Sequence, residues 1–503
     1  MSLIQVSDLS FTYEGSYAPV FEHVSFQIDT DWKLGFTGRN GRGKTTFLRL
    51  LMGQLEYEGT ISSGVRFDYF PFPVEQPERD TYEILEELLG ETPLWEMYRE
   101  LSRLQVADDV LYRPFSTLSN GERTKVLLAA LFLREGNFLL IDEPTNHLDR
   151  EARQVVSRYL NSKKGFILVS HDRAFLDGCV DHILAINRAD IEVQKGDFSS
   201  WYENRRRRDA YELAENERLK KDIGRLQSAA RQSGDWADQV EDTKLGWCPK
   251  KAKTFLGTRA YIGEKSRKMQ QRRKNLERRQ EQAMEEKKGL LKNLETTESL
   301  KLIARKHHSD RLVVLDHAAV CYGEPLQPVC RELSVELHQG ERLSLQGRNG
   351  CGKSSILKLI MQQEAANGVW KASGLVISYV PQDTSFLKGS LKDYALECGV
   401  EEQLFLALLR KLDFDRAQFE KPMEHYSEGQ KKKVLIARSL CQQAHLYIWD
   451  EPLNFIDIYS RMQIEELILK FQPTMLLVEH DEAFTERVAT GVVPVVRVTE
   501  DVR

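Results

Sequence analysis

Short hydrophobic runs separated by turns occupy both ends of the chain. Near the start they cover residues 3–6, 24–28 and 33–37, and the last of these leads into a glycine-rich loop and a further apolar stretch at 47–51. Short apolar runs bounded by turns favour strands, and the stretch after the loop favours a helix. The order strand, loop, helix predicts an α/β fold at each end of the chain.

The middle of the chain follows a helical pattern instead. Apolar residues recur there at steps of three, four and seven: Leu219, Ile223, Leu226, Met269, Leu276, Ala283 and Leu290. Narrow apolar seams on two charged helices predict an antiparallel hairpin. Helices of roughly 35 residues reach about 50 Å. We therefore expect two α/β domains, 1–201 and 311–503, joined by a helical hairpin at 202–310.

One glycine-rich loop occurs twice, at 38–46 and 347–355. Glycines let backbone N–H groups point at a phosphate, the lysine reaches the β- and γ-phosphates, and the following hydroxyl ligates Mg²⁺. Each copy therefore predicts an ATP site. The predicted loop residues are Gly38, Arg39, Asn40, Gly41, Arg42, Gly43, Lys44, Thr45, Thr46, Gly347, Arg348, Asn349, Gly350, Cys351, Gly352, Lys353, Ser354 and Ser355.

Two apolar strands end in paired carboxylates, Asp142-Glu143 and Asp450-Glu451. Such a pair is costly at the end of a buried strand unless it handles a metal and a proton. The aspartate is suited to the Mg²⁺ shell, and the glutamate to orienting or deprotonating the attacking water. Helix capping is the alternative. Both pairs stand between a glycine-loop helix and a later strand that carries a histidine, which favours catalysis.

The reactive residues keep one spacing in the two halves. Lys44 recurs as Lys353 and His171 as His480, each 309 residues later. A lone histidine at a strand end is usually structural, but two in register with two carboxylate pairs predict γ-phosphate sensors.

Tyr13 and Tyr322 keep the same spacing of 309 residues, which favours stacking on adenine over a half-buried strand position. Two further segments, 118–122 and 426–430, precede predicted helices with a serine and a glycine. A helix N-terminus is an anion site, whereas an ordinary N-cap is the alternative. The predicted phosphate contacts there are Ser119, Gly121, Ser427 and Gly429.

Composition narrows the class of protein. A chain of 503 residues has room for two large domains and an insert. Its seven scattered cysteines show no metal-binding spacing, which favours a reduced, cytoplasmic setting. The longest apolar run, 126–133, is far shorter than the ~20 residues of a membrane span, and no secretory signal is visible.

Positive charge is concentrated in the insert. Residues 202–310 carry 28 Lys/Arg and 18 Asp/Glu, and residues 244–279 carry 13 and 2, although the whole chain has a net charge of −5. Gly and Pro near 244–263 predict a tip. Lysines interleaved with rings suit nucleic acid, whereas a solvated coiled coil with an aromatic cap is the alternative. The predicted RNA-contacting residues are Lys244, Trp247, Lys250, Lys251, Lys253, Phe255, Arg259 and Tyr261.

These motifs together resemble those of the ATP-binding cassette (ABC) ATPases, over roughly residues 1–200 and 311–497. The loops match Walker A, residues 118–122 and, more loosely, 426–430 match the signature, and the carboxylate pairs match Walker B with its catalytic glutamate. Residues 148–149 and 456–457 match the D-loop. The resemblance implies a P-loop fold, ATP and Mg²⁺.

The resemblance also implies how the sites are shared. Two cassettes facing head to tail would place each ATP between one loop and the opposite signature, within a monomer. The implied metal ligands are Thr45, Asp142, Ser354, Gln382 and Asp450, and the implied catalytic residues are Glu143, Glu451, His171 and His480. The family's glutamine matches Gln382, but the first half has Phe72 there, which cannot ligate Mg²⁺.

Tandem cassettes joined by a basic helical hairpin resemble the ABC-F ribosome-binding ATPases along the whole chain. A long linker with a short 84–115 segment is most similar to the antibiotic-resistance members of the Lsa and Vga type. This implies contact with the large ribosomal subunit, its rRNA and a tRNA, without DNA or membrane. It also implies protection from lincosamides, pleuromutilins and streptogramin A. A housekeeping translation factor and a transporter ATPase remain alternatives. A DNA-repair ATPase is less favoured, because its coiled coil normally interrupts one cassette and ends in a Cys-x-x-Cys hook.

Overall fold

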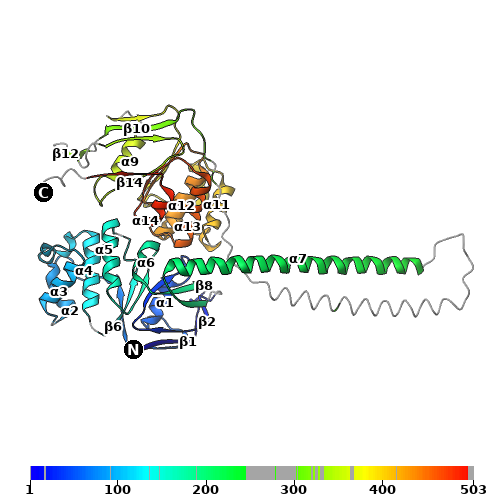
Figure 1. Ribbon diagram of the computed structural model, residues 1–503, viewed down its shortest axis with the longest axis horizontal. Helices are drawn as coiled ribbons and strands as arrows, with labels where there is room; N and C mark the ends of the chain where they lie inside the picture. The colour runs from blue at the N-terminus through cyan, green and yellow to red at the C-terminus, as the bar shows by residue number, and fades with distance from the viewer. Residues whose placement is uncertain are drawn as a thin grey trace, which may run out of the picture. The chain divides into compact units, whose positions relative to one another are not determined.

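The computed structural model describes residues 2–15, 19–90, 92–134, 136–146, 148–187, 190–244, 278, 302, 304–318, 321–322, 327–328, 333–362, 368–414 and 416–496. They form two compact units, one of residues 1–201 with 297–503 and one of residues 202–296. The first unit contains two α/β cassettes (Figure 1).

The first cassette contains a mostly parallel sheet and an antiparallel sheet. The first has the order β5-β6-β7-β3-β8-β9, with only β8 and β9 antiparallel, and the second has the order β2-β1-β4. The strands are β1 Leu3–Phe11, β2 Phe21–Asp29, β3 Lys33–Thr37, β4 Glu58–Ser62, β5 Arg66–Phe70, β6 Asn137–Asp142, β7 Phe166–Val169, β8 His182–Asn187 and β9 Asp190–Lys195. The helices are α1 Lys44–Leu51, α2 Thr81–Leu89, α3 Leu94–Arg103, η1 Asp108–Tyr112, η2 Phe115–Thr117, α4 Asn120–Leu133, α5 Arg150–Asn161 and α6 Arg173–Cys179.

The second cassette repeats this plan. Its parallel sheet has the order β16-β17-β18-β14-β19, beside an antiparallel sheet β13-β10-β15 and the pair β11-β12. The strands are β10 Arg311–Ala318, β11 Cys321–Tyr322, β12 Gln327–Pro328, β13 Leu333–His338, β14 Arg342–Gln346, β15 Val369–Lys371, β16 Ile377–Val380, β17 Leu446–Asp450, β18 Met475–Val478 and β19 Gly491–Pro494. The helices are α9 Lys353–Met361, α10 Leu391–Glu397, α11 Glu402–Lys411, η3 Arg416–Gln418, η4 Met423–His425, α12 Glu428–Cys441, α13 Ile458–Phe471 and α14 Glu482–Val488.

The core of the first cassette fixes the phosphate loop. Phe47 and Leu48 of α1 are fully buried in one cluster with Phe36 of β3, Leu140 of β6 and Ile4 of β1. Helix α1 is thereby packed together with strands of both sheets. Because strands β3 and β6 lie in this core, their carboxyl ends bring the loop and the carboxylate pair to one edge of the sheet.

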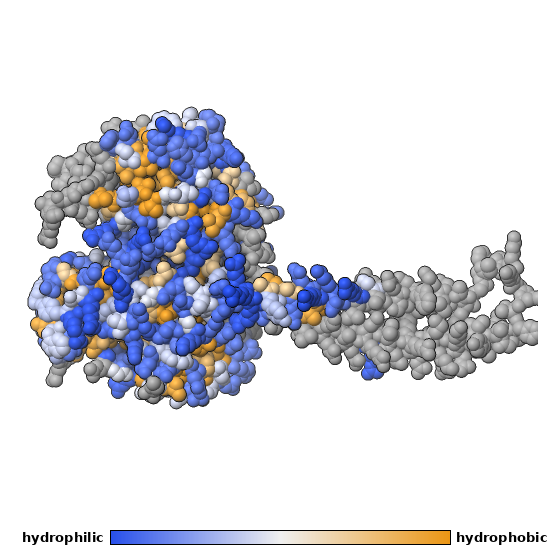
Figure 2. Space-filling model, viewed as in Figure 1, coloured by the Kyte–Doolittle hydropathy of each residue, from blue (hydrophilic) through white to orange (hydrophobic). Residues whose placement is uncertain are grey.

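Helix α7 (Phe198–Lys244) starts in the first unit, where Phe198 and Trp201 are buried, and continues into the second. The predicted return of the hairpin and its tip lie outside the described residues, apart from a helical residue at 278. Hydrophilic residues cover most of the surface seen in Figure 2, with hydrophobic ones in separate patches. Across the described residues, every helix is too short or too polar to cross a membrane.

Replacing Leu140 with Ala tests the buried strand that carries Asp142. Leu140 is fully buried in β6, so its truncation should lower the free energy of unfolding by about 2–5 kcal/mol. Leu3→Ala is the control, because Leu3 is 55% exposed and its loss should cost less than about 0.5 kcal/mol. Urea denaturation measures both. Equal costs would contradict the assignment of β6 to the core.

Candidate functional site

The first phosphate loop joins β3 to α1. Gly41 and Gly43 have φ of 80° and 94°, a left-handed conformation that glycine adopts without strain. The Lys44 ammonium donates to the carbonyls of Gly38 at 2.8 Å and Arg39 at 3.2 Å. Burial lowers the pKa of Lys44. The loop thus holds a cation above a curled backbone, as a phosphate site requires.

The second loop has the same geometry between β14 and α9. Gly350 and Gly352 have φ of 78° and 101°, and Lys353 donates to the carbonyls of Gly347 at 2.7 Å and Arg348 at 3.0 Å. Cys351 differs from its neighbours, because its side chain is buried in the hydrophobic core. A contribution of Cys351 to ligand binding would therefore come from its backbone.

The carboxylate of Asp142 lies beside the first loop. Its Oδ2 accepts hydrogen bonds from the Thr45 hydroxyl at 3.2 Å and from the Tyr69 hydroxyl at 2.9 Å. Burial raises the pKa of Asp142 despite these two donors. Tyr69 stands at the position of Tyr379 in the second half, and no sequence motif marks it as a site residue.

Glu143 lies next to Asp142 with its backbone at φ 51°, and its amide donates to the Val169 carbonyl at 2.9 Å. Both carboxylate oxygens are buried without a hydrogen bond, and His171 Nε2 lies 3.3 Å from Oε1. Burial and the charge of Asp142 raise the pKa of Glu143. A buried carboxylate beside a phosphate loop, with a histidine ring close to one of its oxygens, is suited to binding a water.

The second carboxylate pair is held differently. Ser354 donates to Asp450 at 3.1 Å, and Glu451 Oε2 accepts from Gln382 at 2.9 Å and Asn454 at 2.7 Å. His480 Nε2 lies 3.5 Å from Glu451 Oε1. Burial alone would raise the pKa of Glu451, but the contacts with His480 and Gln382 hold it below its ordinary value.

The two candidate metal sites offer the ligands that Mg²⁺ prefers. Each combines a hydroxyl with a carboxylate, Thr45 with Asp142 and Ser354 with Asp450, and water and phosphate oxygens would complete an octahedral shell. Among the described residues no cluster of three or more His, Cys, Asp or Glu forms a separate metal site. The residues present therefore fit a phosphate-bound Mg²⁺.

Phe72 and Gln382 occupy equivalent positions with different surroundings. Phe72 lines a cavity of about 450 Å³ with Tyr69, and the Arg134 guanidinium lies 6.0 Å from the Phe72 ring. Gln382 instead contacts Glu451. Near Asp142 the polar group from this segment is the Tyr69 hydroxyl, so the first site differs from the second in its side-chain donors.

Of the two tyrosines predicted to contact adenine, the structure describes the side chain of Tyr13 only. Tyr13 is 44% exposed, and its hydroxyl forms a 2.7 Å hydrogen bond with the Thr46 hydroxyl beside the first loop. Tyr322 is in β11, but its side chain lies outside the described residues. Lys244 ends α7, also without a described side chain, and all the other predicted tip residues lie outside: Trp247, Lys250, Lys251, Lys253, Phe255, Arg259 and Tyr261.

The first loop contacts the second cassette next to its D-loop and lies beside Gly429 of its signature segment. The Asn40 amide donates to the Phe455 carbonyl at 3.0 Å, and Arg39 pairs with Asp413 at 3.1 Å. A Cβ on Gly429 would lie 2.4 Å from the Phe455 oxygen and 3.4 Å from the Asn40 amide nitrogen. Glycine is therefore required at 429. Ser427 beside it caps α12.

The second loop faces the signature segment of the first cassette across a cavity of about 1000 Å³. Ser119 caps α4 in the same capping box as Ser427 does for α12. The lining includes most of the residues predicted for this site: Ser119, Gly121, Arg348, Asn349, Gly350, Gly352, Lys353, Ser354, Ser355, Gln382, Glu451 and His480. The structure thus brings each loop to the opposite signature.

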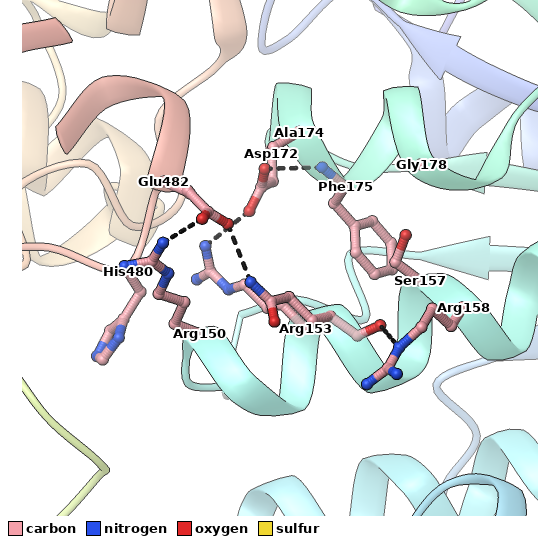
Figure 3. A pocket seen from close by; sticks show the side chains of 11 residues that line it. Arg150, Arg153, Ser157, Arg158, Asp172, Ala174, Phe175, Gly178, His480 and Glu482 are labelled. Atoms are coloured by element: carbon pink, nitrogen blue, oxygen red, sulfur yellow. Dashed lines mark hydrogen bonds and ion pairs between the residues drawn. The ribbon is translucent and has the colours of Figure 1, made fainter. Parts of the chain in front are cut away.

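Charged residues also link the cassettes beyond the loops. In Figure 3 Arg150 of α5 bonds to Glu482 of α14, and Arg153 bonds to Asp172 at 2.8 Å. In the other cassette Arg461 makes the equivalent 2.9 Å bond to Asp481. The charge of Asp481, after burial, raises the pKa of Asp172. The charged side chains in this region between the cassettes therefore form ion pairs.

Comparison with known proteins decides the family. The ABC transporter family matches residues 21–146 and 330–454, the segments that hold both phosphate loops, both signatures and both carboxylate pairs. The chain belongs to the ABC ATPases. The predicted resemblance to the ABC-F family is also confirmed, and the protein is an ATPase.

The relatives are similar along almost the whole chain. The ribosome protection protein VmlR of Bacillus subtilis (strain 168) is 29% identical over 491 residues, which cover 95% of this chain and 84% of VmlR. The energy-dependent translational throttle protein EttA of Haemophilus influenzae (strain ATCC 51907 / DSM 11121 / KW20 / Rd) is 25% identical over 537 residues, covering 95% and 90%. Both names describe proteins of translation.

A solved structure shares the fold. The archaeal ribosome recycling factor aABCE1, in complex with the ribosomal stalk protein aP1, matches with a TM-score of 0.58 at 19% identity, covering 97% of this chain and 87% of that one. This similarity supports the tandem-cassette fold.

Tyr69→Phe tests the hydroxyl contact at the first site. Its loss removes a hydrogen bond to a carboxylate, so binding of Mg²⁺–ATP to the first loop should weaken by about tenfold. Titration is made in a Lys353→Ala background, which leaves the first loop to bind. Tyr379→Phe is the matched control and should change affinity less than about twofold. Equal effects of the two changes would argue against a role for Tyr69.

Proposed function

We propose that the protein is a ribosome-binding ATPase that enters the exit-tRNA site and protects the peptidyl transferase centre from lincosamides, pleuromutilins and streptogramin A. The observation that carries this proposal is the approach of each phosphate loop to the opposite signature, in a chain similar to VmlR over 95% of its length. The basic insert supports an RNA partner, because it carries 13 Lys/Arg and 2 Asp/Glu at 244–279.

Hydrolysis is assigned to residues of both cassettes. Lys44 and Lys353 bind phosphates, while Ser427 with Gly429 and Ser119 with Gly121 close the sites from the opposite cassette. Thr45 with Asp142, and Ser354 with Asp450 and Gln382, would hold Mg²⁺, which neutralises charge on the phosphate oxygens when bound. Glu143 and Glu451 orient the attacking water and accept its proton, and His171 and His480 contact the γ-phosphate.

ATP acts as the link between the cassettes. Helix α7 leaves the first cassette after Trp201, and β10 opens the second at Arg311. A change in the angle between cassettes therefore moves the two roots of the insert. Shifting a population from 1:99 to 99:1 closed takes ~5.5 kcal/mol of differential binding, which two ATP interfaces can supply. ATP-bound protein then holds the ribosome, and ADP-bound protein leaves it.

A housekeeping translation factor is the second candidate, and its support is the 25% identity to EttA over 95% of the chain. Both candidates use the same ATP switch. They differ in drug protection, so susceptibility testing of a strain that expresses the protein separates them. The transporter-subunit alternative gives the basic insert no role.

The variant Glu143→Gln/Glu451→Gln tests the switch. It should bind ATP without cleaving it, because the proton-accepting carboxylates are gone, and should accumulate on ribosomes. Co-sedimentation in ATP measures the bound fraction. The control is Lys44→Ala/Lys353→Ala, which loses the phosphate-binding lysines and should stay off ribosomes. A glutamine variant that dissociates as readily as the parent protein would rule out the switch.

Replacing residues 247–255 with a Gly/Ser loop tests the tip. ATPase activity should remain within about twofold of the parent, because the exchange lies away from the cassettes in sequence, while drug protection should be lost. Lys220→Ala/Lys221→Ala is the control, since both lysines are exposed on α7 and should be dispensable. Minimum inhibitory concentrations and steady-state ATPase rates are compared. Loss of both properties would show that the tip is only structural.

A further inference from the structure

Helix α12 carries two consecutive buried lysines, Lys432 and Lys433, which are 2% and 4% exposed. A buried ammonium is costly unless it is paired and hydrogen-bonded. Counted from the signature serine, the equivalent residues of α4 are Thr124 and Lys125. Lys432 is therefore a charge that the first cassette lacks.

Lys433 lies on the side of α12 that is close to the first phosphate loop. Its ammonium lies 2.9 Å from Asp457 and donates to the Leu412 carbonyl at 2.7 Å. Asp457 follows Phe455, whose carbonyl accepts from Asn40 of the first loop. Lys433 thus belongs to the D-loop contact of the first site.

Lys432 lies instead beside the second ATP site. Its ammonium donates to the Pro381 carbonyl at 3.0 Å, and the next residue, Gln382, donates to Glu451 at 2.9 Å. The acidic groups around Lys432 are Glu479, Glu451, Asp450 and Glu428. Lys432 therefore positions the 381–382 segment, and Gln382 of that segment is hydrogen-bonded to the candidate catalytic residue Glu451.

Glu479, the residue directly after β18, is a second buried charge near the second site. It is 6% exposed, and its carboxylate accepts from the amide of Leu453 at 2.8 Å and from the amide of His480 at 3.0 Å. It thereby binds the loop after Glu451 and the backbone of the candidate sensor His480. The first cassette has Ser170 at this place, which contacts Thr145 and the Asp172 amide.

Three sequence differences between the cassettes thus lie near the carboxylate of Glu451. Lys432, Glu479 and Gln382 stand where the first cassette has Thr124, Ser170 and Phe72. The three residues form a single arrangement around Glu451, whereas Glu143 has no hydrogen bond to its carboxylate oxygens.

We propose that Lys432 and Glu479 are positioning residues of the second ATP site, which fix the Gln382 segment, Glu451 and His480 so that this site turns over faster than the first. The inference rests on the proposed roles of Glu143 and Glu451. It adds that the two sites are unequal and names the residues responsible.

The test replaces both residues with their first-cassette counterparts, Lys432→Thr/Glu479→Ser, which removes the charges together. In a Glu143→Gln background the remaining turnover belongs to the second site, and kcat should fall at least about tenfold, the loss expected for one charged hydrogen bond, with KM changed less than about threefold. In a Glu451→Gln background the same exchange should change kcat less than about twofold.

Two controls separate positioning from folding. Lys432→Arg keeps the charge and should retain more kcat than Lys432→Thr in the Glu143→Gln background. Thr124→Ser/Ser170→Ala alters the equivalent places of the first cassette and should leave second-site turnover unchanged. Thermal unfolding of Lys432→Thr/Glu479→Ser should stay within a few degrees of the parent, and its ATP binding should persist.

The outcomes are distinct. An equal loss of kcat in both backgrounds, or unchanged kcat in the Glu143→Gln background, overturns the positioning role. Faster turnover in Glu451→Gln than in Glu143→Gln overturns the order of the two sites. If Glu143→Gln/Glu451→Gln hydrolyses ATP as fast as the parent, the proposed function itself fails.

Discussion

Each ATP site depends on the contact between one phosphate loop and the signature helix of the opposite cassette. A loop alone supplies a lysine, curled amides and a hydroxyl, but the α-helix start that faces it comes from a segment several hundred residues away. At the first site the Asn40 amide lies beside Gly429 of the signature and donates to the Phe455 carbonyl next to the D-loop. In the function that we propose, nucleotide binding is therefore coupled to the angle between the cassettes.

The two sites share a plan and differ in how their carboxylates are held. The two phosphate loops have the same features, namely left-handed glycines and a lysine that donates to two loop carbonyls. The two glutamates differ in the hydrogen bonds of their side chains. Glu451 accepts two side-chain hydrogen bonds, whereas the oxygens of Glu143 are buried without one. The two halves thus share the backbone conformation of the phosphate loop, while their candidate catalytic glutamates have different neighbours.

The sequence predicted the parts of this structure that depend on local patterns. Apolar runs ending in Asp142 or His171 predicted strands, and the glycine spacing predicted loops at Lys44 and Lys353. It did not reveal contacts made by residues distant in sequence, such as Tyr69 with Asp142 or Glu479 with the amide of Leu453. A signal was present, since both residues stand at positions where the halves can be compared. Side-chain direction, however, follows from the packing of β5 and β18, which no local pattern encodes. The predicted role of each residue and the predicted tip remain predictions.

The central claim is that nucleotide state sets affinity for the ribosome. The most direct measurement is the dissociation constant of the unmodified protein for purified ribosomes, in a non-hydrolysable ATP analogue, in ADP and without nucleotide. Our account predicts binding at least about tenfold tighter with the analogue than with ADP, a difference of about 1.4 kcal/mol. Equal affinity in the three conditions would contradict it.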